Sequence, residues 1–114
     1  MPAQVQNLVL EQGTTFSVNV ALTDANNNPL DVSDYTAQST MRRDYMSQNS
    51  IPITATLTTG ILNLSMTANN SANVAPGRYV YDAVVFDTNG VVTRVIEGLI
   101  NVTPEVTNWA NTNP

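Results

Sequence analysis

Carboxylates are the most abundant reactive groups in this sequence. Its 114 residues include nine Asp and Glu, four Arg, and no Lys, His or Cys. The chain therefore lacks a thiol nucleophile, thiolate or imidazole ligands for zinc, and the commonest general base. From this composition we expect a protein that is not an enzyme and that holds no cofactor or metal.

One stretch has the spacing of a cation-binding loop. Residues 24–28 match the opening of a calcium loop, but Pro29 replaces the required Gly, and Tyr35 stands where the loop needs an acid. Asp and Asn side chains also stabilise turns by hydrogen bonding to the backbone two residues further on. The favoured interpretation is an Asx-rich connection between strands.

Two pairs of carboxylates could in principle hydrolyse a glycoside. Asp31 with Asp34, and Asp82 with Asp87, would need carboxyl groups held roughly 5–9 Å apart in a cleft. Nothing in the sequence places either pair in a cleft, and Asp at the end of a strand is ordinarily a turn residue. We expect turn roles for all four.

Four residues are candidates for contact with a partner. Arg42 and Arg43 are adjacent, so on a strand they point to opposite faces and favour salt bridges between sheets or subunits over one anion clamp. Trp109 is the only Trp and lies in a polar tail, where an exposed indole is costly unless something covers it. It either anchors a partner or packs on its own domain. We predict partner contacts at Trp109, Tyr45, Arg42 and Arg43.

The elements that must position these residues are strands. Apolar residues recur at every second position, which is the period of a half-buried strand. The predicted strands are residues 14–23, 36–45, 51–57, 61–66, 78–86 and 91–102, with a first edge strand near 5–10. Thr59-Gly60 and Asn89-Gly90 predict hairpins, and Gly98 predicts a bulge. Residues 68–75 predict a short helical crossover before Pro76.

This pattern predicts one all-β domain. A spacing of about ten residues between strands favours an antiparallel β-sandwich of about seven to eight strands. The domain covers residues 1–104, and residues 105–114 form a polar C-terminal arm. A chain of this length can bury a core without disulfide or metal.

The stretch Ala75-Pro-Gly-Arg-Tyr-Val-Tyr-Asp82 resembles the tyrosine corner of immunoglobulin-like sandwiches, with Tyr81 where a disulfide Cys might stand. More broadly, residues 8–107 are similar to small immunoglobulin-like domains of tailed-bacteriophage virion proteins. The motifs that carry the similarity are residues 13–16, 28–31, 35–37, 42–43, 76–82, Gly90 and 94–98. The resemblance implies an immunoglobulin-like fold and fold-defining roles for Gly77, Tyr79, Tyr81, Asn89 and Gly90.

The resemblance also implies a function without catalytic residues. Such domains bind neighbouring subunits, so we expect a virion structural protein assembled in the host cytoplasm, with the capsid decoration or cement type as the leading interpretation. A tail, neck or baseplate adaptor is the alternative. The expected partners are the major capsid protein or tail proteins of the same particle, and we expect a homo-oligomer or a symmetric array.

Charge and hydropathy restrict the other partners. A net charge of −5 and a pI of about 4.1 oppose binding to phosphate backbones, so we expect no nucleic acid. The sequence has neither a targeting segment nor the roughly 20 consecutive apolar residues of a membrane span, so we expect a soluble, unprocessed chain. A carbohydrate-binding module remains an alternative of a different class, with Tyr35, Tyr45 and Trp109 as its sugar platforms.

Overall fold

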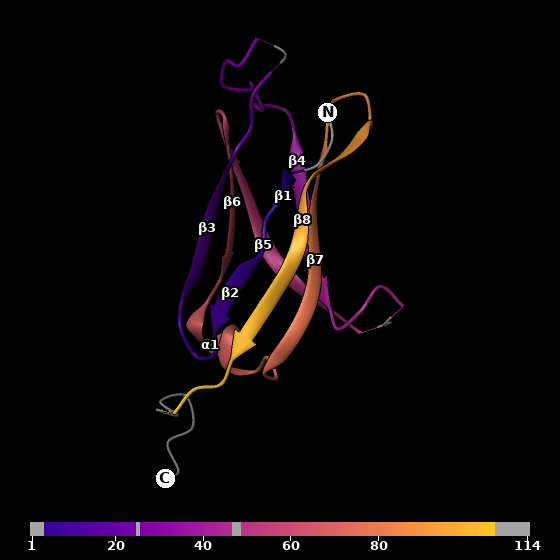
Figure 1. The fold of residues 1–114 in the computed structure, drawn as a ribbon. Helices are drawn as coiled ribbons and strands as arrows, with labels where there is room; N and C mark the ends of the chain where they lie inside the picture. The colour runs from indigo at the N-terminus through magenta and orange to yellow at the C-terminus, as the bar shows by residue number, and fades with distance from the viewer. Residues whose placement is uncertain (1–3, 25, 47–48, 107–114) are drawn as a thin grey trace.

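The protein is an all-β molecule with one short helix. The computed structural model describes residues 4–24, 26–46 and 49–106, and within them it has eight strands and a five-residue helix (Figure 1). The strands are β1 (Gln4–Val5), β2 (Leu8–Glu11), β3 (Phe16–Ala21), β4 (Thr36–Arg42), β5 (Ser50–Thr58), β6 (Ile61–Met66), β7 (Gly77–Phe86) and β8 (Val92–Thr103). The all-β prediction is confirmed.

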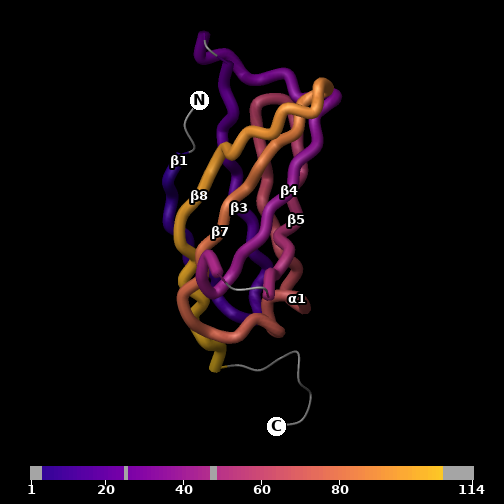
Figure 2. The backbone as a smooth tube through the Cα atoms, turned by 90° about the vertical axis from the view of Figure 1, so that its right-hand side faces the viewer, coloured from indigo at the N-terminus to yellow at the C-terminus, as the bar shows by residue number. Residues whose placement is uncertain are grey.

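The strands form one curled, mixed sheet in the order β1-β8-β7-β4-β5-β6-β3, with β2 also paired to β8. Figure 2 shows the strands running lengthwise around the long axis of the molecule. Strand β5 lets the sheet curl, because it pairs with β4 up to Ile53 and with β6 from Thr54 onward. The β1 and β2 strands run parallel to β8, so the prediction of a purely antiparallel arrangement is wrong.

Alternating side chains from every part of the sheet fill a single core. On β7, Tyr79, Tyr81, Ala83 and Val85 are buried while the residues between them face outward, as the period of two predicts. The largest fully buried side chains in the described residues are Leu10, Met41, Leu62, Leu64, Ile96, Ile100, Val102 and Ser71. Burying each of the large apolar ones stabilises the fold by about 1.5–3 kcal/mol.

The predicted crossover before Pro76 is helix α1 (Ala68–Ala72). Thr67 caps it by accepting a hydrogen bond from the Asn70 N–H at 3.2 Å. The fully buried Ser71 hydroxyl donates to the Thr14 carbonyl at 2.7 Å and accepts from the Gly13 N–H at 3.1 Å. These bonds fasten the helix to the turn between β2 and β3.

Among the described residues, no helical segment has the length and apolar character of a membrane span.

Both predicted hairpins are present. The β7–β8 turn is closed by Asp87, whose Oδ1 accepts the N–H groups of Asn89 at 2.8 Å and Val91 at 2.9 Å. Gly90 has φ +80°, whereas Asn89 keeps a negative φ, so only the glycine uses the left-handed region. The β5–β6 turn places Gly60 at φ +74° against Pro29.

Gly98 has a different role from the predicted bulge. The pairing of β7 with β8 is regular at Gly98, which lies opposite Tyr81, and the irregularity falls at Val95 instead. A Cβ atom at position 98 would overlap the Gln6 carbonyl oxygen. Gly98 therefore allows the N-terminal segment to lie close against β8, and the prediction of a bulge there is wrong.

Candidate functional site

The outward side chains of β4, β7 and β8 form the face with the most chemical variety. Because side chains alternate along a strand, the neighbours of the buried residues point outward together. Register aligns Thr40 with Asp82 and Asp82 with Glu97, and in the next row it aligns Arg42 with Val80. We call this set the outer face: Thr36, Gln38, Thr40, Arg42, Arg78, Val80, Asp82, Val84, Phe86, Val92, Arg94, Glu97, Leu99 and Asn101.

A bulge on β8 decides which charges reach the outer face. Residues three apart on a regular strand point to opposite faces, but the register with β7 skips Val95. Val95 and Ile96 are both buried, and Arg94 and Glu97 consequently lie on the same face. Arg94 Nε lies 3.3 Å from Asp82 Oδ2, and its Nη1 lies 3.2 Å from Glu97 Oε2. The extra residue thus creates this ion-pair network.

The network orients side chains more than it stabilises the fold. The Arg94 side chain is 56% exposed, and both carboxylates are 40% exposed. Ion pairs this exposed contribute about 0–1 kcal/mol, because water screens the charges. The guanidinium of Arg94 is therefore held in place by two acids at little gain in stability.

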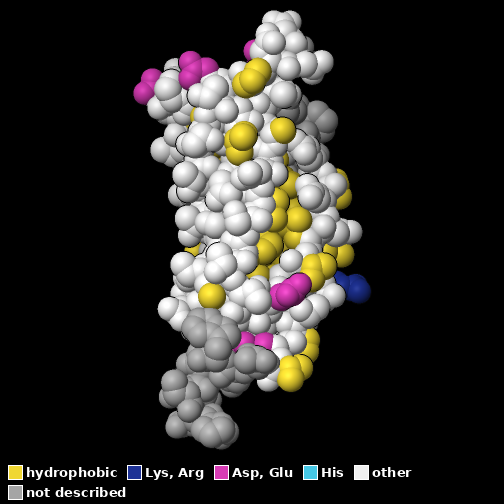
Figure 3. Space-filling model, turned by 90° about the vertical axis from the view of Figure 1, so that its left-hand side faces the viewer, with side chains coloured by type: hydrophobic (Ala, Val, Ile, Leu, Met, Phe, Trp, Pro, Cys, Tyr) yellow, Lys and Arg dark blue, Asp and Glu magenta, His cyan; other side chains and the backbone are white. Residues whose placement is uncertain are grey.

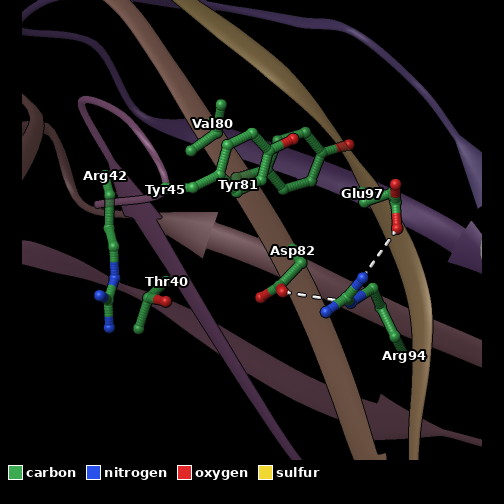
Figure 4. A pocket seen from close by; sticks show the side chains of 8 residues that line it. All are labelled: Thr40, Arg42, Tyr45, Val80, Tyr81, Asp82, Arg94 and Glu97. Carbon is green, nitrogen blue, oxygen red and sulfur yellow. Dashed lines mark hydrogen bonds and ion pairs between the residues drawn. The ribbon is translucent and has the colours of Figure 1, made fainter. Parts of the chain in front are cut away.

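A groove of about 260 Å³ lies along the outer face (Figure 4). Figure 4 shows Arg42 and Thr40 on one side of Asp82 and Arg94 on the other. Its lining residues are Thr40, Arg42, Tyr45, Val80, Tyr81, Asp82, Arg94 and Glu97. The groove combines two guanidinium groups, two carboxylates, two aromatic rings and a half-buried Val, a mixture suited to contact with another protein.

Tyr81 lines the groove but serves the fold. Its hydroxyl donates to the Gln6 carbonyl at 2.7 Å, and burial raises the pKa of Tyr81 to about 12. The phenol therefore stays protonated near neutral pH and fastens the N-terminal segment to β7. This role fits the predicted fold-defining position and makes Tyr81 unsuited to proton transfer.

The outer face concentrates the positive charge of the chain. Arg42, Arg78 and Arg94 lie there, which is three of the four Arg, together with only two of the nine acidic residues. Every charged side chain lies in the described part of the chain, so the remaining surface carries seven acids and one Arg. A cationic face on an acidic molecule favours an acidic partner surface.

Exposed apolar side chains lie beside these charges. Tyr45 and Met46 follow β4 and are 82% and 88% exposed, and Tyr45 borders the groove. Aromatic residues, Met and Arg are the types enriched in protein interfaces, so their clustering marks this end of the outer face as a contact surface.

Arg43 is separated from Arg42, as the sequence predicts. Strand β4 ends at Arg42, so the expected strand to Tyr45 is too long. The Arg43 guanidinium lies 4.7 Å from the centre of the Tyr79 ring and donates to the Pro76 carbonyl at 3.1 Å. Arg43 thus has contacts within its own chain.

Gly77 and Tyr79, two of the residues predicted to define the fold, both lie against Arg43. A Cβ atom on Gly77 would overlap the Arg43 guanidinium, so the glycine provides the space that the cation occupies. The Tyr79 hydroxyl donates to the Ala75 carbonyl at 2.7 Å. That hydrogen bond closes the turn between α1 and β7.

The predicted carboxylate pairs have structural partners instead of a shared cleft. Asp82 pairs with Arg94 in the middle of β7, whereas Asp87 caps the β7–β8 turn. The Ser33 hydroxyl at 2.8 Å and the Ser33 N–H at 3.1 Å both donate to Asp31 and lower the pKa of its carboxyl. These contacts support the turn interpretation for Asp31 and Asp87. Asp82 instead lies within β7 and pairs with Arg94, so the expectation of a turn role is wrong for Asp82.

Asp24, Asn26 and Asn28 make the contacts expected of an Asx-rich connection. Asp24 Oδ1 accepts the N–H groups of Asn26 at 2.8 Å and Asn28 at 3.1 Å, and Asn27 takes φ +65°. Within the described residues, no three acidic side chains gather as a metal site would require.

The two aromatic candidates in the described residues, Tyr35 and Tyr45, do not form one platform. Tyr35 precedes β4 and packs against the core, while Tyr45 follows β4, so a seven-residue strand of roughly 23 Å separates them. Trp109 and residues 107–114 of the predicted arm lie outside the described residues.

Sequence reasoning missed the pairing of Asp82, Arg94 and Glu97. The available signal was the consecutive apolar pair Val95-Ile96, which interrupts the alternation of β8. A comparison with models of known protein families and with curated protein sequences finds no match to the chain. The interpretation of the outer face therefore depends on its own geometry and chemistry.

Proposed function

We propose that this chain is a non-enzymatic structural protein of a tailed-phage virion, a capsid decoration subunit that binds neighbouring capsid subunits. The observation that carries the proposal is the concentration of three Arg on one face, beside the exposed Tyr45 and Met46. Tyr and Arg supply much of the energy in protein interfaces. The virion setting rests on the sequence resemblance to small phage domains.

We also propose an immunoglobulin-like arrangement of the strands. In it, β2, β8, β7, β4 and the first half of β5 make one layer, and β3, β6 and the second half of β5 make the other. Two observations support this assignment: β5 changes partner after Ile53, and the Tyr79 hydroxyl binds the Ala75 carbonyl.

The mechanism is burial of surface between subunits. Arg42 and Arg78 would pair with acidic groups of the neighbour, while Tyr45 and Met46 would pack against its apolar surface. Each contact is modest, but many symmetric copies on one shell add their contributions. The chain would thereby resist separation of capsid subunits without any covalent step.

Copy number in the particle tests the location. Quantitative mass spectrometry of particles made by the phage that encodes the chain should find hundreds of copies if it decorates the shell. Six or twelve copies would favour the alternative of a tail, neck or baseplate adaptor. Absence from purified particles would refute both assignments.

Substitution on the outer face tests the binding surface. Removing a hot-spot Tyr or Arg from an interface costs about 2 kcal/mol or more, so we expect Tyr45→Ala and Arg42→Ala each to weaken binding to particles lacking the chain by about 30-fold. Thr56→Ala is the matched control, since Thr56 is exposed on β5 and distant from the groove. Equal binding by all three variants would exclude the outer face.

The exposed ring of Tyr45 beside the groove carboxylates also fits a sugar, which keeps the carbohydrate-binding alternative testable. Saturable glycan binding that Tyr45→Ala abolishes would favour this second function over the first.

A further inference from the structure

Strand β3 is an open edge of the sheet. It pairs antiparallel with β6 along all six residues, from Phe16 to Ala21. In the described part of the chain no strand pairs with its other edge, and one side-chain bond reaches it there, from Gln4 Nε2 to the Ala21 carbonyl at 3.1 Å. Such an edge presents a row of backbone donors and acceptors that another strand can pair with.

None of the usual protections against pairing occurs on β3. The strand carries no charged residue, no Pro and no bulge, and all four Arg and nine acids lie outside β3, β5 and β6. The strands β3, β5 and β6 therefore carry no charged side chain, although the whole chain has a net charge of −5. Two copies of an acidic chain meet with the least repulsion at such uncharged strands.

Apolar surface remains uncovered beside this edge. Figure 3 shows a seam of apolar side chains running along the molecule on the side where β3 lies. Val18 points toward the core yet is only half-buried, whereas Phe16 and Val20 on either side of it are buried. An added strand next to β3 would cover this seam as well as pair with the backbone.

We propose that β3 pairs antiparallel with β3 of a second copy of this chain, about a two-fold axis at Val18. Directly opposed residues share a face in an antiparallel pair, so Phe16 would oppose the partner's Val20. Ser17 would oppose the partner's Asn19, and both side chains already accept hydrogen bonds from Asn63 Nδ2, at 2.9 and 2.8 Å. The partner is a second copy because the same six residues complement themselves.

This pairing leaves the outer face free, since β4, β7 and β8 are not involved. The inference therefore stands whether or not the outer face binds a capsid subunit. A dimer joined at β3 would present two outer faces.

Single cysteines test both the contact and its register, because the natural chain has no Cys. Residues opposed at the axis have Cα atoms about 4.5–5.5 Å apart, within disulfide range, so Val18→Cys should form a cross-linked dimer under mild oxidation. The two equivalent cysteines of Ser17→Cys would lie about 8 Å apart, too far for a disulfide. Ser17→Cys and the distant control Thr56→Cys should stay monomeric on a denaturing gel.

Sedimentation measurements provide an independent readout. The natural chain should associate reversibly to a dimer, Val18→Thr should keep that dimer, and Val18→Lys should raise its dissociation constant at least tenfold by placing two ammonium groups together. Circular dichroism shows whether each variant is folded. If Val18→Lys does not fold, cross-linking of the cysteine variants decides whether β3 pairs with a second copy. A natural chain that is monomeric at its highest soluble concentration, or cross-linking of Val18→Cys no greater than that of Thr56→Cys, would overturn the proposal.

Discussion

Replacing Tyr79 with Phe removes one hydroxyl while leaving the buried ring and its contact with Arg43 in place. The lost bond is 2.7 Å long and joins the hydroxyl to the Ala75 carbonyl. Ala75 is exposed, so water can solvate its carbonyl after the change, and the cost is the net value of a hydrogen bond, about 1 kcal/mol. An unfolding entropy of about 2.1 cal/mol/K per residue converts this into a fall in Tm of about 4 °C.

Thermal and urea unfolding measure this difference directly. Tyr45→Phe is the matched control, because it deletes the same hydroxyl from a ring that is 82% exposed, and its stability should match that of the natural chain. If Tyr79→Phe unfolds at the same temperature and urea concentration as Tyr45→Phe, the corner hydrogen bond contributes nothing, and the reasoning about the α1–β7 turn fails.

Three further changes have outcomes fixed by the contacts described. Gly98→Ala should push the N-terminal strands away from β8, because the new Cβ overlaps the Gln6 carbonyl. Amide hydrogen exchange in residues 4–11 should then accelerate, and unchanged protection would contradict the close packing. Folding favours the protonated Tyr81 phenol, because its pKa is about 12 in the folded protein and about 10 in the unfolded chain. The free energy of unfolding should therefore fall as pH rises from about 10 to about 12. Urea titrations at each pH should show a smaller fall for Tyr81→Phe. Folding favours the ionised Asp31 carboxyl, so its contribution to the free energy of unfolding is present above the ordinary pKa of Asp and is lost as pH falls through the lowered pKa. Ser33→Ala should raise the Asp31 pKa in an NMR titration, and an unchanged pKa would refute the assigned cause.

Short-range patterns in the sequence predicted much of the fold. Alternation located β7 and β8 because one face of each strand is buried. The Asn89-Gly90 pair located their hairpin, although only Gly90 takes the left-handed conformation and Asp87 caps the turn. The α1 crossover followed from the Pro76-Gly77 stop. These features depend on neighbours in sequence, which is why sequence alone was sufficient.

Contacts between distant segments were not predictable in this way. The parallel pairing of β2 with β8 depends on a close approach at Gly98 that no local pattern encodes. The sequence pattern around Ser71 indicates only a helix residue, although its hydroxyl donates a hydrogen bond to the Thr14 carbonyl. Of the predicted partner contacts, Arg42 and Tyr45 lie together at the groove, while Arg43 packs on Tyr79.

Parallel pairing of β2 with the last strand, β8, affects how the molecule responds to force. Strands β2 and β8 run in the same direction, so tension applied at Leu8 and Thr103 slides one strand along the other. All the hydrogen bonds between Leu8–Glu11 and Ile100–Thr103 then carry load at the same time, whereas a hairpin pulled at its open end loses its bonds one by one. The chain is therefore built to resist stretching along its long axis.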